Sequence, residues 1–318
     1  MAALQPVQEA LVEHQVLGLA HDDERIAALE REVAALRLQA QRMATWQPPG
    51  HYYSPIPDAA EVLARGDELF CRTHRSLPGI DLNFARQEEL LRIFLPFYPE
   101  QPFGEQPSAR CRYGFANDQF GHADALFLYF VLRHARPRRV VEVGTGWSTC
   151  VMLDVDDLFL GGTMEITSID PDPSRLRARM RPGDESRVRI LEQPVQRVPL
   201  ETYDALQAHD VLFIDSTHVL KTGSDVNHLM FHVLPRLESG VWVHVHDVPY
   251  PFEYPREWVA EGRAWNEAYA WRAFLQYNAA FDLQIMNTCL EFLEPDWFRQ
   301  NMPLCLQNVG GSLWLRRR

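Results

Sequence analysis

Residues 139–149 read RVVEVGTGWST, and this stretch decides the fold because a β-branched apolar run ends there in a glycine-containing turn. Gly144 and Gly146 permit a tight turn and let a ligand approach the backbone closely. The apolar run CVML follows at 150–153 and is expected to open a helix, whose N-terminus attracts anionic groups. A dinucleotide fingerprint would place a third glycine where this chain has Thr149. The turn therefore predicts a nucleotide-like ligand without identifying it.

Downstream of the turn, short apolar runs alternate with longer amphipathic stretches, which is typical of a parallel sheet covered by helices on both faces. The predicted fold class is α/β, with a doubly wound, mostly parallel seven-stranded sheet and an N-terminal helical extension. We expect helices near 147–158, 173–180, 200–207, 223–237 and 265–278. We expect strands at 139–143, 165–170, 188–191, 210–215, 240–246, 281–287 and 312–316.

The N-terminal region carries apolar residues at alternating spacings of three and four, separated by charged residues, namely Ile26, Leu29, Val33, Leu36, Ala40 and Met43. This spacing predicts an amphipathic or coiled-coil helix within residues 1–45. Such a helix either joins copies of the chain into a homo-oligomer or folds back on its own domain. The sequence QPPG at 47–50 cannot continue it.

The rest of the chain is expected to form two further parts. Residues 46–135 should be a linker and a helical cap, with helices at 58–75, 86–97 and 122–135. The last of these is apolar nearly all round and should be buried. Residues 136–318 should be the ligand-binding domain, with a lid insertion near 249–278.

Composition excludes several classes of protein. The net charge of −12 argues against a nucleic-acid partner, because binding to phosphates depends on clustered cations. No apolar run reaches the ~18 residues that a membrane helix needs, so no membrane association is expected. The five cysteines form no C-x-x-C pair, which is typical of reduced thiols in a cytoplasmic protein.

Two carboxylates near the turn are candidates for ligand contacts. Asp170 ends the apolar run ITSI, where it can accept hydrogen bonds from the ribose hydroxyls of an adenosine-containing ligand. The alternative for Asp170 is a helix N-cap. Glu142 could reach a cationic amino-acid group, whose carboxylate would meet Ser148 and Thr149; the alternative is a structural carboxylate bonded to its own turn.

Two later strands each end in polar residues. DVLFIDSTH at 210–218 places Asp215 at a strand end and His218 in the following loop, and VWVHVHD at 241–247 ends in His246 and Asp247. The carboxyl ends of such strands open onto one crevice in a doubly wound sheet. We therefore expect these side chains to converge beside the glycine turn.

The four segments VEVGTGWST, SIDPDPSRL, DVLFIDSTH and VHVHD together resemble S-adenosylmethionine-dependent methyltransferases of class I. The resemblance is to a bacterial group related to macrolide-sugar O-methyltransferases and, distantly, to catechol O-methyltransferase. It covers about residues 50–318 and includes the terminal segment GGSLWLR at 310–316. It implies an enzyme that uses S-adenosyl-L-methionine to methylate an oxygen of a small polar acceptor, such as a sugar or a secondary metabolite.

The resemblance also implies roles for single residues. His218 is the candidate general base, acting with Asp215, and a histidine suits this task near neutral pH. The cofactor would bind to Glu142, Gly144, Gly146, Ser148, Thr149, Asp170, Gln193, Val195 and Asp124.

In the metal-dependent members of the group, carboxylates at these strand ends hold a divalent cation that orients the acceptor and lowers its pKa. Asp215 and Asp247 match those positions, and His246 stands where the macrolide-sugar enzymes have an acidic residue. A nitrogen ligand would favour Mn, Fe or Zn over Mg. The alternative is that His246 faces away and no metal binds; His244 shares its strand face, so one of the two histidines can instead belong to the core.

The aromatic and proline-rich segments 249–258 and 261–267 are interpreted as a substrate lid. Packing against the N-terminal helices is the alternative. Four residues are candidates for acceptor contacts: Tyr53, Tyr250, Arg263 and Asn266.

Two other functions remain open. An NAD-dependent oxidoreductase can share this fold class, although Thr149 and the D-x-x-H segment count against it. A non-catalytic protein could instead use the N-terminal helix to recruit partners and the second domain as a cofactor-binding scaffold.

Overall fold

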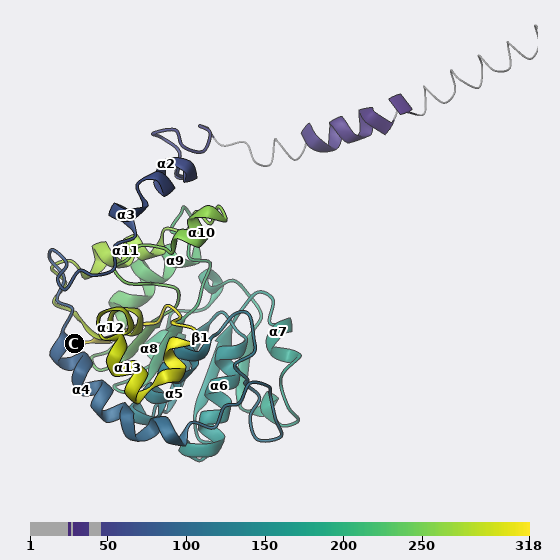
Figure 1. Ribbon diagram of the computed structural model, residues 1–318. Helices are drawn as coiled ribbons and strands as arrows, with labels where there is room; N and C mark the ends of the chain where they lie inside the picture. The colour runs from purple at the N-terminus through teal and green to yellow at the C-terminus, as the bar shows by residue number, and fades with distance from the viewer. Residues whose placement is uncertain (1–24, 27, 38–45) are drawn as a thin grey trace, which may run out of the picture. The chain divides into compact units, whose positions relative to one another are not determined.

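The computed structural model describes residues 25–26, 28–37 and 46–318 (Figure 1). The chain divides into two compact units, residues 1–59 and residues 60–318. In the first unit, residues 25–26 and 28–37 are helical, and we call them the N-terminal helix. They include Ile26, Leu29, Val33 and Leu36 of the predicted apolar seam, whereas Ala40 and Met43 lie outside the described residues.

The described part of the second unit contains a seven-stranded sheet in the order β3-β2-β1-β4-β5-β7-β6. Strands β1 to β5 are parallel to their neighbours, and β7 is antiparallel to both β5 and β6. This arrangement confirms the predicted fold class. The strands are β1 (Arg139–Val143), β2 (Glu165–Ile169), β3 (Val188–Leu191), β4 (Val211–Ile214), β5 (Trp242–Val245), β6 (Phe281–Met286) and β7 (Leu313–Arg317).

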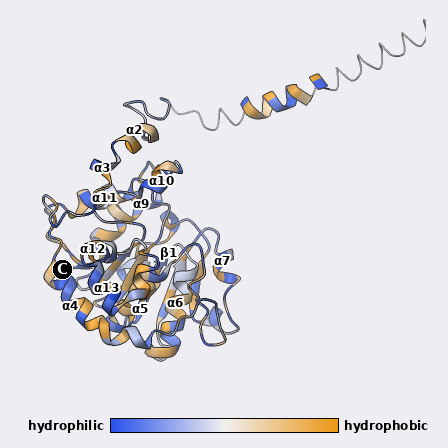
Figure 2. Cartoon of the chain, in the orientation of Figure 1, coloured by the Kyte–Doolittle hydropathy of each residue, from blue (hydrophilic) through white to orange (hydrophobic). Residues whose placement is uncertain are grey.

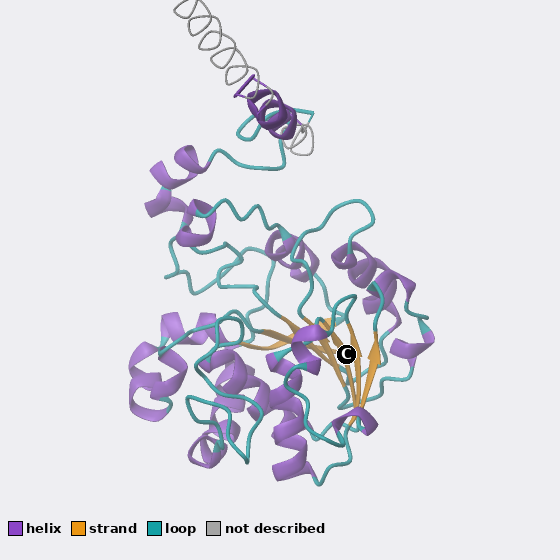
Figure 3. Cartoon of the chain, turned by 90° about the vertical axis from the view of Figure 1, so that its right-hand side faces the viewer, coloured by secondary structure: helices purple, strands orange, loops and turns teal. Residues whose placement is uncertain are grey.

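The central strands lie between two hydrophobic cores, which explains their continuous apolar runs. Every residue of β4 and β5 is buried. On one face, Phe213 and Trp242 pack with side chains from α4, α5 and α6. On the other face, Leu212 and Val243 pack with residues of α8, α9 and α11. Figure 3 shows the strands running between these helical layers.

The α-helices of the second unit are placed as the periodicity predicts in most cases. Helix α5 spans the predicted range 122–135, and it is buried along nearly its whole length. The α-helices are α2 (Ala59–Ala64), α3 (Gly66–Leu69), α4 (Phe84–Phe94), α5 (His122–Ala135), α6 (Trp147–Val155), α7 (Ser174–Arg177), α8 (Glu201–Asp204), α9 (Asp225–His228), α10 (Arg256–Ala260), α11 (Glu267–Leu275), α12 (Asn287–Leu293) and α13 (Pro295–Asn301).

Several predicted helices are divided, and the chain also contains short 3₁₀ and π segments. The expected helix 58–75 is α2 and α3, and the expected helix 223–237 is α9 followed by other helical turns. These segments are η1 (Leu95–Glu100), η2 (Asp156–Leu160), η3 (Asp184–Ser186), η4 (Val195–Arg197), η5 (Leu229–Val233), η6 (Leu234–Arg236) and η7 (Pro303–Leu306). Among the described residues, no helix is long and apolar enough to cross a membrane.

Helices α12 and α13 were not predicted. Strand β6 ends at Met286 and α12 begins at Asn287, so no connecting loop separates the two elements in the sequence. Pro295 then occupies the first position of α13, where its fixed φ is compatible with a helix. These two helices carry Leu290 and Phe298 into the core beside α5.

Candidate functional site

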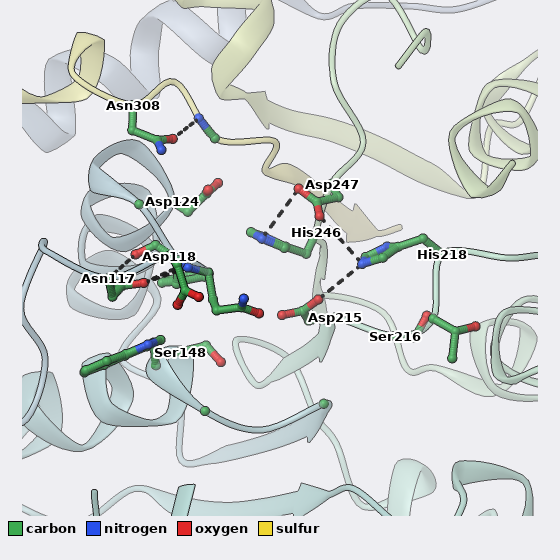
Figure 4. A pocket seen from close by; sticks show the side chains of 18 of the residues that line it. Asn117, Asp118, Asp124, Ser148, Asp215, Ser216, His218, His246, Asp247 and Asn308 are labelled. Carbon is green, nitrogen blue, oxygen red and sulfur yellow. Dashed lines mark hydrogen bonds and ion pairs between the residues drawn. The ribbon is translucent and has the colours of Figure 1, made fainter. Parts of the chain in front are cut away.

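A cavity of about 800 Å³ lies at the carboxyl ends of the central strands (Figure 4). Its floor includes the glycine turn after β1 and the strand ends of β4 and β5. Its walls come from the start of α5, the segment 255–265 and residues 308–310. A second cavity of about 430 Å³ adjoins it and shares Gly144, Asp170 and Asp215. The crevice predicted from the parallel strands is therefore present.

Gly144 is required by its surroundings. Its φ is +81°, and a Cβ atom built on it would lie 1.9 Å from the backbone oxygen of Asp215. Both facts exclude a larger residue without movement of the strand ends. The turn therefore brings the backbone of β1 against that of β4, and both line the two cavities.

Glu142 does not line either cavity. It is completely buried and accepts hydrogen bonds of 2.7 Å from the hydroxyls of Ser148, Thr149 and Ser168. Burial raises its pKa to about 7, although these hydroxyl contacts partly oppose the shift. Glu142 thus fastens α6 and β2 to β1 from beneath the turn, which favours the structural alternative for this residue.

The two predicted ligand contacts on α6, Ser148 and Thr149, have different positions. Ser148 lines the larger cavity, whereas Thr149 is fully buried and accepts a 3.2 Å hydrogen bond from the amide of Gly146. We therefore correct the predicted ligand contacts of Glu142 and Thr149 to a structural role. Gly144, Gly146 and Ser148 keep their place at the cavity surface.

Asp170 lines both cavities at the end of β2. It accepts hydrogen bonds from the amide and hydroxyl of Thr145, at 3.0 and 3.2 Å, which ties it to the glycine turn. The amide of Ser174 bonds instead to Asp172, at 3.2 Å. Asp170 is therefore not the cap of the following helix, and its carboxylate faces the ligand space.

The strand end of β3 contributes to the smaller cavity. Val195 and Gln196 line it, whereas Gln193 lines neither of the two cavities. The predicted contact of Val195 therefore lies at the cavity and that of Gln193 does not, because the chain turns into a 3₁₀ segment at Val195.

Asp124 lines the larger cavity from the first turn of α5. Its carboxylate accepts hydrogen bonds from the amide of Gly311 at 3.0 Å and from the hydroxyl of Ser312 at 2.6 Å. A Cβ atom on Gly310 would lie 2.1 Å from Asp124 Oδ2. Asp124 therefore holds the segment before β7 against α5 and closes one side of the cavity.

His218 lies between the carboxylates of Asp215, Asp247 and Glu267 (Figure 4 shows the first two). Its Nε2 atom is 3.5 Å from Asp215 Oδ1 and 3.7 Å from Asp247 Oδ2. Burial by itself would lower the pKa of His218, but the hydrogen bonds to Asp215 and Glu267 and the charge of Asp247 raise it to about 10. The D-x-x-H segment and the end of β5 thus converge, although they are far apart in the chain.

Glu267 is a site residue that the sequence analysis missed. It is buried at the start of α11, and its Oε2 atom lies 3.1 Å from Nδ1 of His218. Its other oxygen accepts a 3.0 Å hydrogen bond from the indole of Trp271. The amides of Asn266 and Glu267 both bond to the carbonyl of His218 at 3.2 Å, which holds His218 at a φ of +60°.

The histidines of β5 have different environments. His244 is fully buried, stacks on Phe213 with ring centroids 4.0 Å apart, and its pKa lies well below the ordinary value because of burial. It is the core histidine of the pair. His246 lines the larger cavity, 3.7 Å from Asp247 Oδ1, with its ring beside Phe120.

The predicted metal ligands Asp215, His246 and Asp247 all line this cavity. Across the described residues, however, no group of three or more His, Cys, Asp or Glu side chains is arranged to hold a metal ion. Nε2 of His218 instead faces Asp215 and Asp247, so both carboxylates already have a cationic neighbour. The residues do not fit a metal in this arrangement, and no chemical step is derived through one.

The candidate acceptor residues lie in different places. Arg263 lines the larger cavity. The side-chain amide of Asn266 instead bonds to the backbone amide and carbonyl of Leu220. Tyr250 is buried and its hydroxyl donates to the carbonyl of His74. Tyr53 belongs to the first unit, where its ring stacks on Trp46 with centroids 5.5 Å apart. We therefore correct Tyr250 and Asn266 to structural residues.

Two indole rings were missed as cavity residues. Trp258 and Trp265 line the larger cavity, with ring centroids 5.2 Å apart. The guanidinium of Arg263 lies 4.7 Å from the first ring and 5.2 Å from the second. The ring of Trp265 is also 4.4 Å from that of His218. The residue types in the predicted lid indicated this aromatic wall, but only the folded chain shows which rings face the cavity.

Residues 141–248 match a family model described as a methyltransferase domain. An uncharacterized protein of Archaeoglobus fulgidus is 36% identical over 170 residues, which cover 50% of this chain and 73% of that protein.

Two solved structures that the chain matches at low sequence identity are those of methyltransferases. The SAH-bound methyltransferase PaMTH1 of Podospora anserina is 14% identical with a TM-score of 0.41, over 86% of this chain and 99% of that chain. The O-methyltransferase TomG of Streptomyces achromogenes, in complex with SAM, is 14% identical with a TM-score of 0.39, over 81% and 95%.

The matched domain contains both the glycine turn and the D-x-x-H segment. The match to the relative at 36% identity covers most of the length of that protein. The sheet places these segments at one edge around the cavity. The chain therefore carries a methyltransferase domain at residues 141–248, and its seven-stranded, mostly parallel sheet matches the fold of class I S-adenosylmethionine-dependent methyltransferases.

Proposed function

We propose that this methyltransferase transfers the methyl group to a hydroxyl oxygen of a small polar acceptor. One observation supports the proposal above all: His218, held by Glu267, faces the same cavity as the glycine turn. A buried, positioned imidazole suits the removal of a proton from a hydroxyl group. A methyl donor and a proton acceptor would thus share one enclosed space.

The residues at the floor fit the cofactor. Gly144 leaves its backbone open to close approach, and Asp170 presents a carboxylate that can accept the ribose hydroxyls. The smaller cavity, lined by Val195 and Gln196, would take the adenine ring. When bound, S-adenosylmethionine supplies a methyl group activated by its sulfonium charge.

The other residues would act on the acceptor. The acceptor oxygen would bond to the methyl carbon as the carbon–sulfur bond of the cofactor breaks, and Nε2 of His218 would accept the hydroxyl proton. Glu267 keeps Nε2 directed into the cavity through its contact with Nδ1. With a pKa of about 10, His218 is mostly protonated near neutral pH. The positive charge of a bound cofactor would lower that pKa and so increase the fraction of neutral imidazole, the form that can accept the proton.

We place the acceptor against Trp258 and Trp265. These rings offer flat apolar surfaces beside His218, and Arg263 adds a cation at the same wall. Asn308 also lines the cavity, and its side-chain nitrogen can donate a hydrogen bond to a polar group of the acceptor. This combination fits a hydroxylated ring, either a sugar or a phenol.

The test of cofactor binding uses Asp170→Ala. Losing one hydrogen-bonding carboxylate costs about 1.5–3 kcal/mol, so we expect the Kd for S-adenosylhomocysteine in calorimetry to rise about 10–100-fold. The matched control is Asp172→Ala, which removes a carboxylate outside both cavities. Binding of NAD instead of S-adenosylhomocysteine, or equal Kd values for the two variants, would contradict the assignment.

A second experiment tests the predicted cation. Because His218 already neighbours Asp215 and Asp247, we expect treatment with EDTA to leave the rate of methyl transfer unchanged within twofold. The assay follows labelled methyl from S-adenosylmethionine into a panel of sugars and phenols. Loss of transfer that Mg²⁺ or Mn²⁺ restores would contradict this expectation and reinstate Asp215, His246 and Asp247 as ligands.

A further inference from the structure

The N-terminal helix presents an apolar stripe to solvent. Its four seam residues are large and exposed: Ile26 by 53%, Leu29 by 53%, Val33 by 43% and Leu36 by 56%. Figure 2 shows hydrophobic and hydrophilic residues alternating along this helix. All the other described residues of the helix are exposed as well. Most helical stability in proteins comes from packing of an apolar face, so a stripe of this kind is stabilised by a partner surface.

The residue types along the stripe fit a second copy of the same helix. The spacing places Ile26 and Val33 at the a positions of a heptad, and Leu29 and Leu36 at the d positions. β-branched residues at a combined with leucine at d favour a two-stranded parallel coiled coil. The residue types along the stripe therefore favour a pair of helices over a larger bundle.

The charges beside the stripe are complementary between copies. Arg25 and Glu32 occupy g positions, and Glu30 and Arg37 occupy e positions. In a parallel pair, a g residue meets the e residue five positions further along the other strand. Arg25 would meet the partner's Glu30, and Glu32 would meet the partner's Arg37. Both pairs join opposite charges.

We propose that the N-terminal helix pairs with a second copy of this chain in a parallel two-stranded coiled coil. The apolar stripe would form the seam, and the flanking ion pairs would set the register. Burial of the exposed side chains would provide the main driving force, at roughly 25 cal/mol for each Å² of apolar surface removed from water. This proposal does not depend on the proposed chemistry.

The test changes the signs of the flanking charges in the full chain. One variant, Glu30→Lys with Glu32→Lys, makes all four flanking positions positive, and the other, Arg25→Glu with Arg37→Glu, makes them all negative. By light scattering we expect about twice the 36.7 kDa of one chain for the unaltered protein and the mass of one chain for each variant. An equimolar mixture of the two variants should recover the double mass. Arg31→Glu, on the outer face of the helix, is the matched control and should stay dimeric.

Orientation is tested by a cross-link. In a parallel pair the two Ile26 positions are adjacent, so Ile26→Cys in a Cys71→Ser background should form an intermolecular disulfide on mild oxidation. Cys71 is replaced because it is partly exposed and could form a disulfide itself, whereas the other four cysteines are buried. A single-chain mass for the unaltered protein, a triple mass, unchanged mass in both charge variants, or a dimer without the cross-link would overturn the proposal.

Discussion

Replacing His218 by alanine should lower kcat for methyl transfer by about 10²–10⁴-fold, the usual contribution of a positioned general base. The imidazole is the only group among the described residues that contacts Asp215, Asp247 and Glu267 together, and it faces the cavity. Its loss removes the proton acceptor and leaves the cofactor-binding floor in place. The measurement is steady-state transfer of labelled methyl to the best acceptor of the sugar and phenol panel.

Cofactor affinity separates a catalytic defect from misfolding. The Kd for S-adenosylhomocysteine should stay within threefold in His218→Ala, because Gly144 and Asp170 are unchanged. His232→Ala, an exposed histidine outside both cavities, is the matched control and should keep full activity. Undiminished transfer by His218→Ala would show that another group accepts the proton.

Glu267→Gln extends the same experiment. Glutamine keeps the shape of the side chain and the contact with Trp271, but it removes the negative charge beside Nδ1 of His218. We expect kcat to fall while KM for the acceptor changes little, since Glu267 acts through His218. Glu267→Asp should recover part of the rate. Equal loss in the two variants, accompanied by a weaker Kd for S-adenosylhomocysteine, would indicate a purely structural role.

Replacing Arg112 by methionine should lower the free energy of unfolding by about 3–5 kcal/mol, the usual effect of removing one partner from a buried ion pair. Arg112 is 7% exposed and holds several carboxylates at once. Its Nη1 atom is 2.9 Å from Asp154 and 2.7 Å from Asp157, and Nη2 is 2.6 Å from Asp184. Methionine fills a similar volume but leaves Asp154 and Asp184 buried without this cation.

Urea unfolding measures the effect, with the midpoint and slope both followed. Arg110→Met is the matched control, because Arg110 is exposed two residues earlier on the same segment. Its unfolding free energy should change by less than about 0.5 kcal/mol, as is usual for surface substitutions. A similar small change for Arg112→Met would show that the carboxylates find other partners or protons at little cost.

Much of the fold could be predicted from local patterns. Strand β4 is a continuous apolar run and helix α5 is apolar nearly all round, so both could be predicted from the lengths of their apolar runs. Helices α12 and α13 could not be predicted, because no connecting loop separates β6 from α12. Their helical state depends on packing against α5, which local propensity does not encode.

The site shows the same division. Asp170 and Asp215 could be placed at the cavity because each ends a parallel strand, and parallel strands share one carboxyl edge. Glu142 was predicted to contact the ligand, but its carboxylate lies beneath the turn and bonds to the hydroxyls of Ser148 and Ser168. The sequence does not show which hydroxyl groups surround a strand residue in the folded chain. Glu267 was missed because it meets His218 across 49 residues of chain.

The sequence by itself determined the α/β class, the glycine turn and the resemblance to methyltransferases, and it predicted the place of Asp170 at the cavity, because these depend on periodicity and on residues close together in the chain. Only the tertiary structure decided which groups surround His218, which indole rings line the cavity, and that Asp215 and Asp247 face an imidazole nitrogen. Such contacts join strand ends, a helix start and a lid from distant segments. Their distances follow from how the layers pack around the sheet, and no local pattern in the chain specifies them.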